Sequence, residues 1–362
     1  MKKRISSLFL TSVNVIEDCC LENGAIVAAN PTKEYYPPVA SHYFYVWPRD
    51  ASYICIAADI AGNEEIQEKF FNWCWNRAED LQNTGLFLEK YFVNGLKALH
   101  RFQPDQTGTV LSAIWHHYNH QAKLDKSLKF EELITCLANG LCNEWRKDHF
   151  SMVTNDLWEE RLTFPDLCDN FTYSLAACIH GLECACKMCI DNKEREKWMS
   201  TAKQMRNLLE HHYIEEHFVR SYGKLIDRAI DVSVLGLVYP FAIYDANDPK
   251  MISTVKEIED KLVINGGVHR YQFDYYDGWV YGGMLRNKGA GAWPLLNFWM
   301  TIYYALQGNT EKAQEYFQWV LERIEKYIPE QLFDNALQVS VSPLAWSHAM
   351  FLIAISFLEL IK

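Results

Sequence analysis

Apolar residues recur every three to four positions along most of this chain, which is the period of an α-helix with one buried face. The spacing predicts helices over residues 51–61, 65–80, 108–121, 129–145, 171–191, 195–213, 231–243, 292–307, 310–327 and 344–361. Alternating strand patterns are short and scarce, and no long or low-complexity linker separates the helices. The pattern therefore predicts an all-α fold of helical hairpins, in one domain that covers residues 1–362.

The N-terminus carries basic residues at 2–4 and an apolar stretch at 5–16, an arrangement that imitates a signal peptide. Polar residues interrupt this stretch and two acidic residues follow it, so we expect the first helix of the domain instead. No apolar run approaches the ~20 residues that a membrane span requires. We therefore expect neither a membrane nor a secretory role.

The cysteines favour a reducing environment. Most of the 11 lie in apolar helical stretches, where thiols behave as small hydrophobic groups. The cluster Cys184, Cys186 and Cys189 lacks a second pair at zinc-site spacing, so we expect no metal there. A cytoplasmic location is the simplest interpretation.

Charge and aromatic content narrow the ligand class. The formal net charge is -11 and no Lys/Arg-rich run occurs, which argues against nucleic acid and anionic membranes as partners. Aromatic residues make up 14% of the chain, and many lie in Gly-, Pro- and Asp-rich segments between helices. That placement favours ligands that stack on rings.

Three carboxylates, Asp156, Glu159 and Glu160, crowd around Trp158 within five positions. Glycoside hydrolysis uses such a setting, because it needs a carboxylic acid that stays protonated near neutral pH beside an aromatic platform for a sugar. The alternative is an ordinary charged helix start with one buried tryptophan.

The chain resembles the family-15 glycoside hydrolases, the glucoamylase and glucodextranase family. The resemblance is carried, in the family's order over about residues 25–360, by seven short segments at 43–50, 103–108, 156–160, 267–271, 292–295, 329–331 and 341–347. It implies an (α/α)6 barrel without a cofactor. It also implies an inverting, exo-acting α-glucosidase that releases β-glucose from the non-reducing ends of α-1,4- or α-1,6-linked gluco-oligosaccharides.

The resemblance implies that Glu159 is the general acid and Glu330 the general base. Inverting enzymes hold two such carboxyl groups roughly 6.5–9.5 Å apart, with a water between the second group and the sugar. The acid needs a raised pKa, which we expect from the apolar wall of Trp158 and the neighbouring carboxylates Asp156 and Glu160. For Glu330 we expect a polar, water-accessible setting that keeps it ionised.

The resemblance also implies a substrate-binding set. Arg49 and Asp50 would hold hydroxyls of the terminal glucose, since one donates hydrogen bonds and the other accepts them. Arg270 would add donors on the same sugar. The other members of the set are Tyr43, Trp47, Asp105, Asp156, Trp158, Glu160 and Trp293.

Two departures and two alternatives accompany the resemblance. Position 106 is Gln where many relatives carry Glu, so substrate preference or pH optimum could differ. Family members often carry further domains that this chain lacks, which favours soluble oligosaccharides as substrates.

Trehalose hydrolysis would use the same first-glucose pocket. A non-catalytic carbohydrate-binding barrel is the other alternative, and the presence of both Glu159 and Glu330 favours a hydrolase. The sequence leaves the oligomeric state open.

Overall fold

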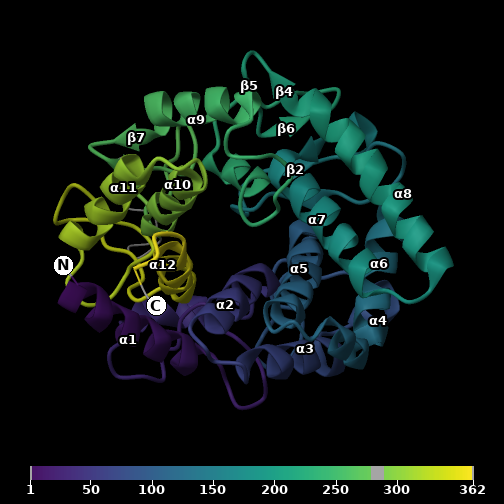
Figure 1. Cartoon of the computed structure of the whole chain (residues 1–362), viewed down its shortest axis with the longest axis horizontal. Helices are drawn as coiled ribbons and strands as arrows, with labels where there is room; N and C mark the ends of the chain where they lie inside the picture. The colour runs from purple at the N-terminus through teal and green to yellow at the C-terminus, as the bar shows by residue number, and fades with distance from the viewer. Residues whose placement is uncertain (1, 279–288, 361–362) are drawn as a thin grey trace.

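The computed structural model describes residues 2–278 and 289–360. Its inner helices form a closed ring (Figure 1). The ring consists of α2 (Pro48–Ile60), α5 (Pro104–His120), α7 (Thr172–Met188), the 3-10 helix η5 (Val232–Leu237), α10 (Pro294–Leu306) and α12 (Ala345–Phe357). Each element packs against the next, and α12 packs against α2 to close the ring. The (α/α)6 barrel is therefore confirmed.

An outer layer of helices covers this ring. It consists of α1 (Lys2–Cys19), α3 (Ile66–Arg77), α6 (Glu131–Glu144), α8 (Asn192–Leu209), α9 (Pro249–Leu262) and α11 (Thr310–Arg323). Inner helices are surrounded by protein and outer helices face solvent on one side, so the two layers differ in which residues are buried. Every residue of α12 from Ala345 to Ile355 is buried, whereas α9 buries one stripe and exposes the rest.

Short elements connect the layers. The connecting helices are η1 (Pro38–Tyr43), α4 (Leu81–Thr84), η2 (Leu124–Phe130), η3 (Pro165–Leu167) and η4 (Glu210–His212). Within residues 2–278 and 289–360, eight two-residue strands form antiparallel pairs: β1 (Thr154–Asn155) with β2 (Leu162–Thr163), β3 (Asn170–Phe171) with β6 (Ser221–Tyr222), β4 (Tyr213–Ile214) with β5 (His217–Phe218), and β7 (Val263–Ile264) with β8 (Gly267–Val268).

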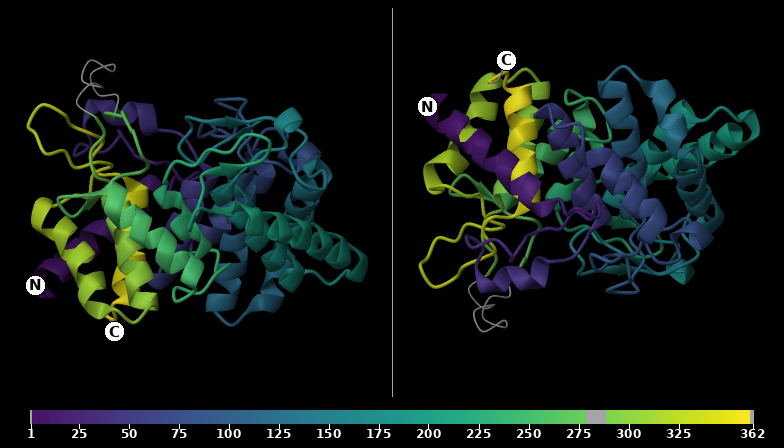
Figure 2. Two further views of the ribbon diagram at one scale, coloured as in Figure 1. Left: turned by 90° about the horizontal axis from the view of Figure 1, so that it is seen from above. Right: turned by 90° about the horizontal axis from the view of Figure 1, so that it is seen from below.

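Proline sets the start of three inner helices, α2, α5 and α10. At the first helical position proline's missing N–H costs nothing, and its ring keeps the preceding residue extended. Trp47, Gln103 and Trp293 are these extended residues. The loops before the inner helices are thereby directed to one end of the barrel. In both side views the connections near residues 20–45 and 325–345 lie toward the same side (Figure 2).

One helix prediction was wrong, and one helix was missed. The segment 231–243 forms only the short η5, because Pro240 cannot continue a helix and Gly236 lies against the ring of Tyr173. Helix α9 was not predicted, although Asp248 caps it by accepting a hydrogen bond from the Lys250 backbone N–H at 2.8 Å. The other predicted helices occur within a few residues of their expected bounds. Residue 361, the end of the last predicted segment, lies outside the described residues.

The described residues include no helix long and apolar enough to cross a bilayer. All eleven cysteines are free thiols. The sulfurs of Cys184, Cys186 and Cys189 contact different partners: the His180 ring, the Arg195 carbonyl and the Asp191 carbonyl. These three thiols therefore do not converge on one point.

Candidate active site

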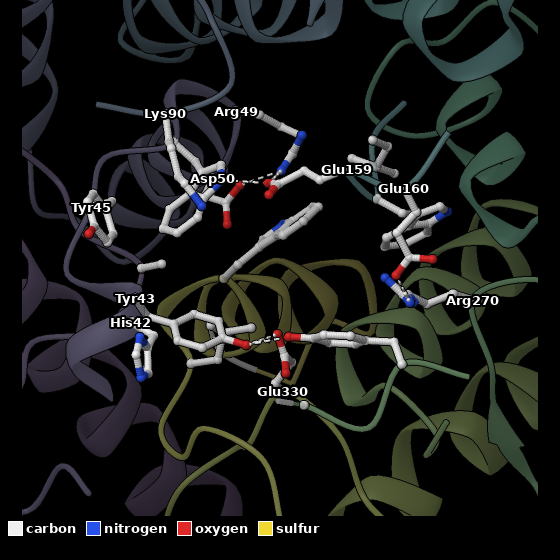
Figure 3. A pocket seen from close by; sticks show the side chains of 18 of the residues that line it. His42, Tyr43, Tyr45, Arg49, Asp50, Lys90, Glu159, Glu160, Arg270 and Glu330 are labelled. Carbon is white, nitrogen blue, oxygen red and sulfur yellow. Dashed lines mark hydrogen bonds and ion pairs between the residues drawn. The ribbon is translucent and has the colours of Figure 1, made fainter. Parts of the chain in front are cut away.

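A cavity of about 1110 Å3 opens at the end of the barrel where the inner helices begin. Figure 3 shows charged side chains and rings that project into it from loops far apart in the sequence. Ten of the twelve residues proposed from the sequence line this cavity. Asp105 and Asp156 do not, and both are buried behind its wall.

The segment around Trp158 is a hairpin loop between β1 and β2, so the alternative of a helix start is wrong. Asp156 holds the loop together, because its Oδ1 accepts hydrogen bonds from the backbone N–H groups of Glu160 at 2.8 Å and Arg161 at 3.0 Å. Burial raises the pKa of Asp156 to about 7, although these two donors lower it. Asp156 therefore holds the loop together and does not line the cavity.

Glu159 occupies a conformation that non-glycine residues rarely adopt, with φ of +64°. Such strain persists only where surrounding contacts enforce it. Its backbone N–H donates to the Asp156 carbonyl at 3.1 Å, and its Oε1 accepts from Trp47 Nε1 at 2.5 Å. The Arg49 guanidinium lies 4.0 Å from the same oxygen. The loop thus directs the carboxyl group into the cavity, where about a quarter of the side chain is exposed.

The carboxylates expected to surround Glu159 lie elsewhere. Asp156 bonds to backbone, and Glu160 pairs with Arg270 at 2.7 Å and accepts from the Tyr271 hydroxyl. Burial, and then the charge of Glu159, raise the pKa of a different carboxyl group, that of Glu89, to about 8. Sequence reasoning missed Glu89, because it lies in a loop without periodic pattern and interacts with Glu159 only in the folded chain.

Glu330 lies in the loop that follows α11, where its backbone N–H donates to the Val341 carbonyl at 2.8 Å. The Tyr43 hydroxyl donates to Glu330 Oε1 at 2.8 Å and also lies 2.8 Å from the Tyr276 hydroxyl. Among the described residues, Oε2 has no hydrogen-bond partner. This oxygen is thus the one left to act on a ligand or a water in the cavity.

The expectation that Glu330 is water-accessible was wrong, because only 4% of the residue is exposed. Burial raises its pKa to about 7, while Tyr43 and the charge of Arg270 lower it and the charge of Glu159 raises it. Figure 3 shows Glu159 and Glu330 on opposite sides of the cavity.

Arg49 connects two carboxylates at the start of α2 and α5. Its guanidinium lies 3.1 Å from Asp50, which lines the cavity, and 3.2 Å from Asp105 behind the wall. Burial raises the pKa of both acids, that of Asp50 to about 6, and the charge of Arg49 lowers both. Asp105 therefore holds Arg49 from behind and does not itself line the cavity. Gln106 is buried and bonds to the Arg49 backbone N–H at 2.5 Å and the Glu89 carbonyl at 3.0 Å.

Arg270 follows β8 and is fixed from two sides. Nε donates to Asp274 Oδ2 at 2.7 Å, and Nη2 donates both to Asp274 Oδ1 at 2.8 Å and to Glu160 Oε1 at 2.7 Å. Its guanidinium also lies over the aromatic rings of Trp158, Tyr276 and Trp293, at 5.2, 4.8 and 5.0 Å from the ring centres. This arrangement presents a rigid cation and flat apolar faces to the same part of the cavity.

One group of possible metal ligands lies outside the cavity lining. Among the residues searched, ligand atoms of Asp148, His149 and Cys168 lie within 4.8 Å of one another. Asp148 is exposed and already bonds to His149 Nδ1 at 2.7 Å. The group takes no part in the arrangement described above.

Comparisons with known proteins agree with this geometry. The chain matches the family model described as glycosyl hydrolases family 15 over residues 14–356. It is 32% identical to an uncharacterized glycosyl hydrolase of Methanocaldococcus jannaschii, covering 92% of this chain and 53% of that protein. It is 22% identical to an isomaltose glucohydrolase of Kribbella flavida, covering 88% and 85%.

A trehalase of Sulfolobus acidocaldarius is 24% identical over 72% of this chain and 42% of its own length. This chain thus spans about half the length of the Methanocaldococcus jannaschii protein and less than half of the Sulfolobus acidocaldarius one. Among solved structures, a glycosidase variant in complex with glucose superposes with a TM-score of 0.82 at 22% identity, covering 100% of this chain and 98% of that one. That likeness supports the barrel fold.

Proposed function

Since the chain belongs to glycosyl hydrolase family 15, we propose that it is an inverting, exo-acting α-glucosidase that releases β-glucose from α-1,4- or α-1,6-linked gluco-oligosaccharides. The observation that carries this proposal is the pair of carboxyl groups, Glu159 and Glu330, on opposite sides of one cavity. Inversion needs that placement, because acid and water act on opposite faces of the sugar.

In the proposed reaction, Glu159 donates its proton to the glycosidic oxygen as the bond to the anomeric carbon breaks. A water on the other face attacks that carbon and gives its proton to Glu330. Tyr43 supports this role of Glu330, because its hydroxyl stabilises the ionised form that a general base requires. The Oε2 atom of Glu330, which has no partner among the described residues, would accept the proton of the water.

Binding of the terminal glucose would use the fixed charges. The Arg49–Asp50 pair offers a donor beside an acceptor, and Arg270 offers donors next to aromatic faces. The cavity, at about 1110 Å3, is slightly larger than the ~300–1,000 Å3 usual for small-ligand sites. That volume supports a substrate of more than one sugar unit.

Isomaltose and related gluco-oligosaccharides are the preferred substrates in this proposal, since the isomaltose glucohydrolase matches along most of both chains. Trehalose is the second candidate, because a relative named trehalase also matches. The eleven free thiols support a reducing, cytoplasmic setting for this activity.

The test is glucose release from maltose, isomaltose, panose, maltotetraose, dextran and trehalose by the wild-type chain and by Glu159→Gln and Glu330→Gln. General acid or base catalysis typically contributes about 10²- to 10⁴-fold, so each variant is expected to lose that much kcat while still binding glucose. Glu183→Gln is the control, because Glu183 forms a surface ion pair with Arg206 and does not line the cavity.

Each outcome separates the candidates. Release from the maltose or isomaltose series supports the α-glucosidase, and release from trehalose alone supports a trehalase. Full turnover in Glu159→Gln would contradict the assignment of the acid. No release from any sugar by folded wild-type protein that still binds glucose would favour a non-catalytic carbohydrate-binding barrel.

A further inference from the structure

Three side chains with metal-binding atoms meet beside the β1–β2 hairpin, outside the cavity. Ligand atoms of Asp148, His149 and Cys168 lie within 4.8 Å of one another. Two ligand atoms on one zinc ion, each at about 2.0–2.3 Å from the metal, can be at most about 4.6 Å apart. Small rotations of these side chains are therefore enough for all three atoms to bind a single ion.

Asp148 and His149 lie in a turn between α6 and β1 that backbone contacts fix. Trp145 and Phe150 pair across this turn, and the Arg146 backbone N–H donates to the His149 carbonyl at 2.7 Å. Asp148 Oδ1 and His149 Nδ1 are 2.7 Å apart. Two such atoms on a tetrahedral zinc ion are about 3.3 Å apart, so binding requires a slight separation. The Asp148 side chain can make this movement, because 56% of it is exposed.

Cys168 reaches the same point from a second turn, which connects β2 to β3. Cys168 follows η3 and has a φ of +50°, a conformation that non-glycine residues keep only where surrounding contacts enforce it. The Lys224 backbone N–H supports this turn by donating to the Leu167 carbonyl at 2.8 Å. Asn170 Nδ2 donates to the Asp148 carbonyl at 2.7 Å and so joins the two turns. The three side chains are thus brought together by the fold of the chain itself.

The kinds of ligand atom select the metal. A thiolate and an imidazole suit zinc, whereas magnesium and calcium prefer sites made of oxygen atoms alone. Three protein ligands leave the fourth tetrahedral position to a water molecule. Asp148 is exposed, while His149 and Cys168 are partly buried. An ion can therefore enter from solvent and still be held by a nitrogen and a sulfur that the protein shields.

We propose that Asp148, His149 and Cys168 form a zinc site that fastens the base of the β1–β2 hairpin. The ion closes a loop from 149 to 168, which contains both strands of the hairpin and Glu159. On binding, the Cys168 thiol releases its proton to solvent, and the Asp148–His149 hydrogen bond is exchanged for two bonds to zinc. Because this site exists only in the folded chain, zinc stabilises that state. No step of the proposed sugar hydrolysis passes through the ion.

Cobalt(II) is the probe, because it occupies zinc sites and absorbs strongly in the near ultraviolet when a thiolate binds it. Titration of metal-free wild-type protein should produce this absorption and saturate at one ion per chain. Cys168→Ser should abolish it, and His149→Gln should raise the Kd for cobalt by about 10- to 100-fold or more. Cys189→Ser is the matched control, because Cys189 is also partly buried but its sulfur lies 3.3 Å from the Asp191 carbonyl. That variant should keep the wild-type titration.

Thermal unfolding with zinc itself tests the fastening of the hairpin. At about a hundredfold excess of free zinc over its Kd, the melting temperature of the wild-type chain should rise by a few degrees, and that of Cys168→Ser should not change. Circular dichroism checks that each variant is folded. A wild-type chain without the cobalt–thiolate absorption would overturn the proposal, as would an absorption that persists in Cys168→Ser. An equal effect of zinc on the melting temperatures of the wild-type chain and Cys168→Ser would also overturn it.

Discussion

The Tyr43→Phe variant tests how the barrel keeps a deeply buried base usable. The substitution removes one hydroxyl, which donates to Glu330 Oε1 at 2.8 Å and lies 2.8 Å from the Tyr276 hydroxyl. A hydrogen bond to a charged group contributes about 1.5–3 kcal/mol. At about 1.36 kcal/mol per pKa unit, its loss corresponds to a rise of about one to two units in the pKa of Glu330.

The direction of the effect follows from the role of the base. Glu330 acts in its ionised form, so activity is present above its pKa and is lost as the pH falls through it. Its pKa is already raised to about 7 by burial. Without the Tyr43 hydroxyl the acidic limb of kcat/KM should move up by about one to two pH units. Below the wild-type limb this means about 10- to 100-fold lower kcat/KM, with recovery at higher pH.

The assay is kcat/KM for the best disaccharide of the panel, measured by glucose release across the acidic limb. Tyr304→Phe is the control, because it removes a similar tyrosine–glutamate hydrogen bond, 2.7 Å to Glu259, on the outer side of the barrel. That variant should keep the wild-type profile. A wild-type acidic limb in Tyr43→Phe, or a loss of activity that is equal at all pH values, would refute the reasoning.

Two further predictions concern the framework. Asp156→Ala leaves the N–H groups of Glu160 and Arg161 without their partner. The free energy of unfolding, measured by thermal unfolding, should fall by about 1–3 kcal/mol, and kcat should fall with it. Wild-type stability and activity would contradict the role of Asp156 in the loop. Gly236→Ala places a methyl group 2.9 Å from the Tyr173 ring. The free energy of unfolding, measured with denaturant, should therefore fall by about 1–3 kcal/mol. An unchanged free energy of unfolding would mean that η5 and α7 can move apart.

Much of the fold could be predicted, because nine of the ten predicted segments form α-helices, each from a periodic apolar pattern that the segment carries by itself. The site motifs could also be identified from short stretches of sequence. Trp47, Arg49 and Asp50 surround a helix start that Pro48 fixes, so their position follows from a short segment. Prediction failed at 231–243, where one proline outweighed the apolar periodicity.

The environment of each carboxyl group could not be predicted, because it depends on contacts between distant loops. Tyr43, 287 positions away, donates a hydrogen bond to Glu330, and the charge of Glu159 raises the pKa of Glu89 from 70 positions along the sequence. Asp105 and Asp156 belong to the right motifs, but they face the protein and not the cavity. A motif therefore identifies the residues of a site, whereas the folded chain decides which of them touch a ligand.

The most direct test of the account is the anomer of glucose that the wild-type chain releases first, followed by proton NMR on isomaltose or maltose before mutarotation mixes the two forms. With Glu159 and Glu330 acting from opposite sides of the cavity, β-glucose should appear first and α-glucose only later, at the rate of spontaneous mutarotation. Release of α-glucose from the start would contradict direct displacement by water and the roles given to both carboxyl groups.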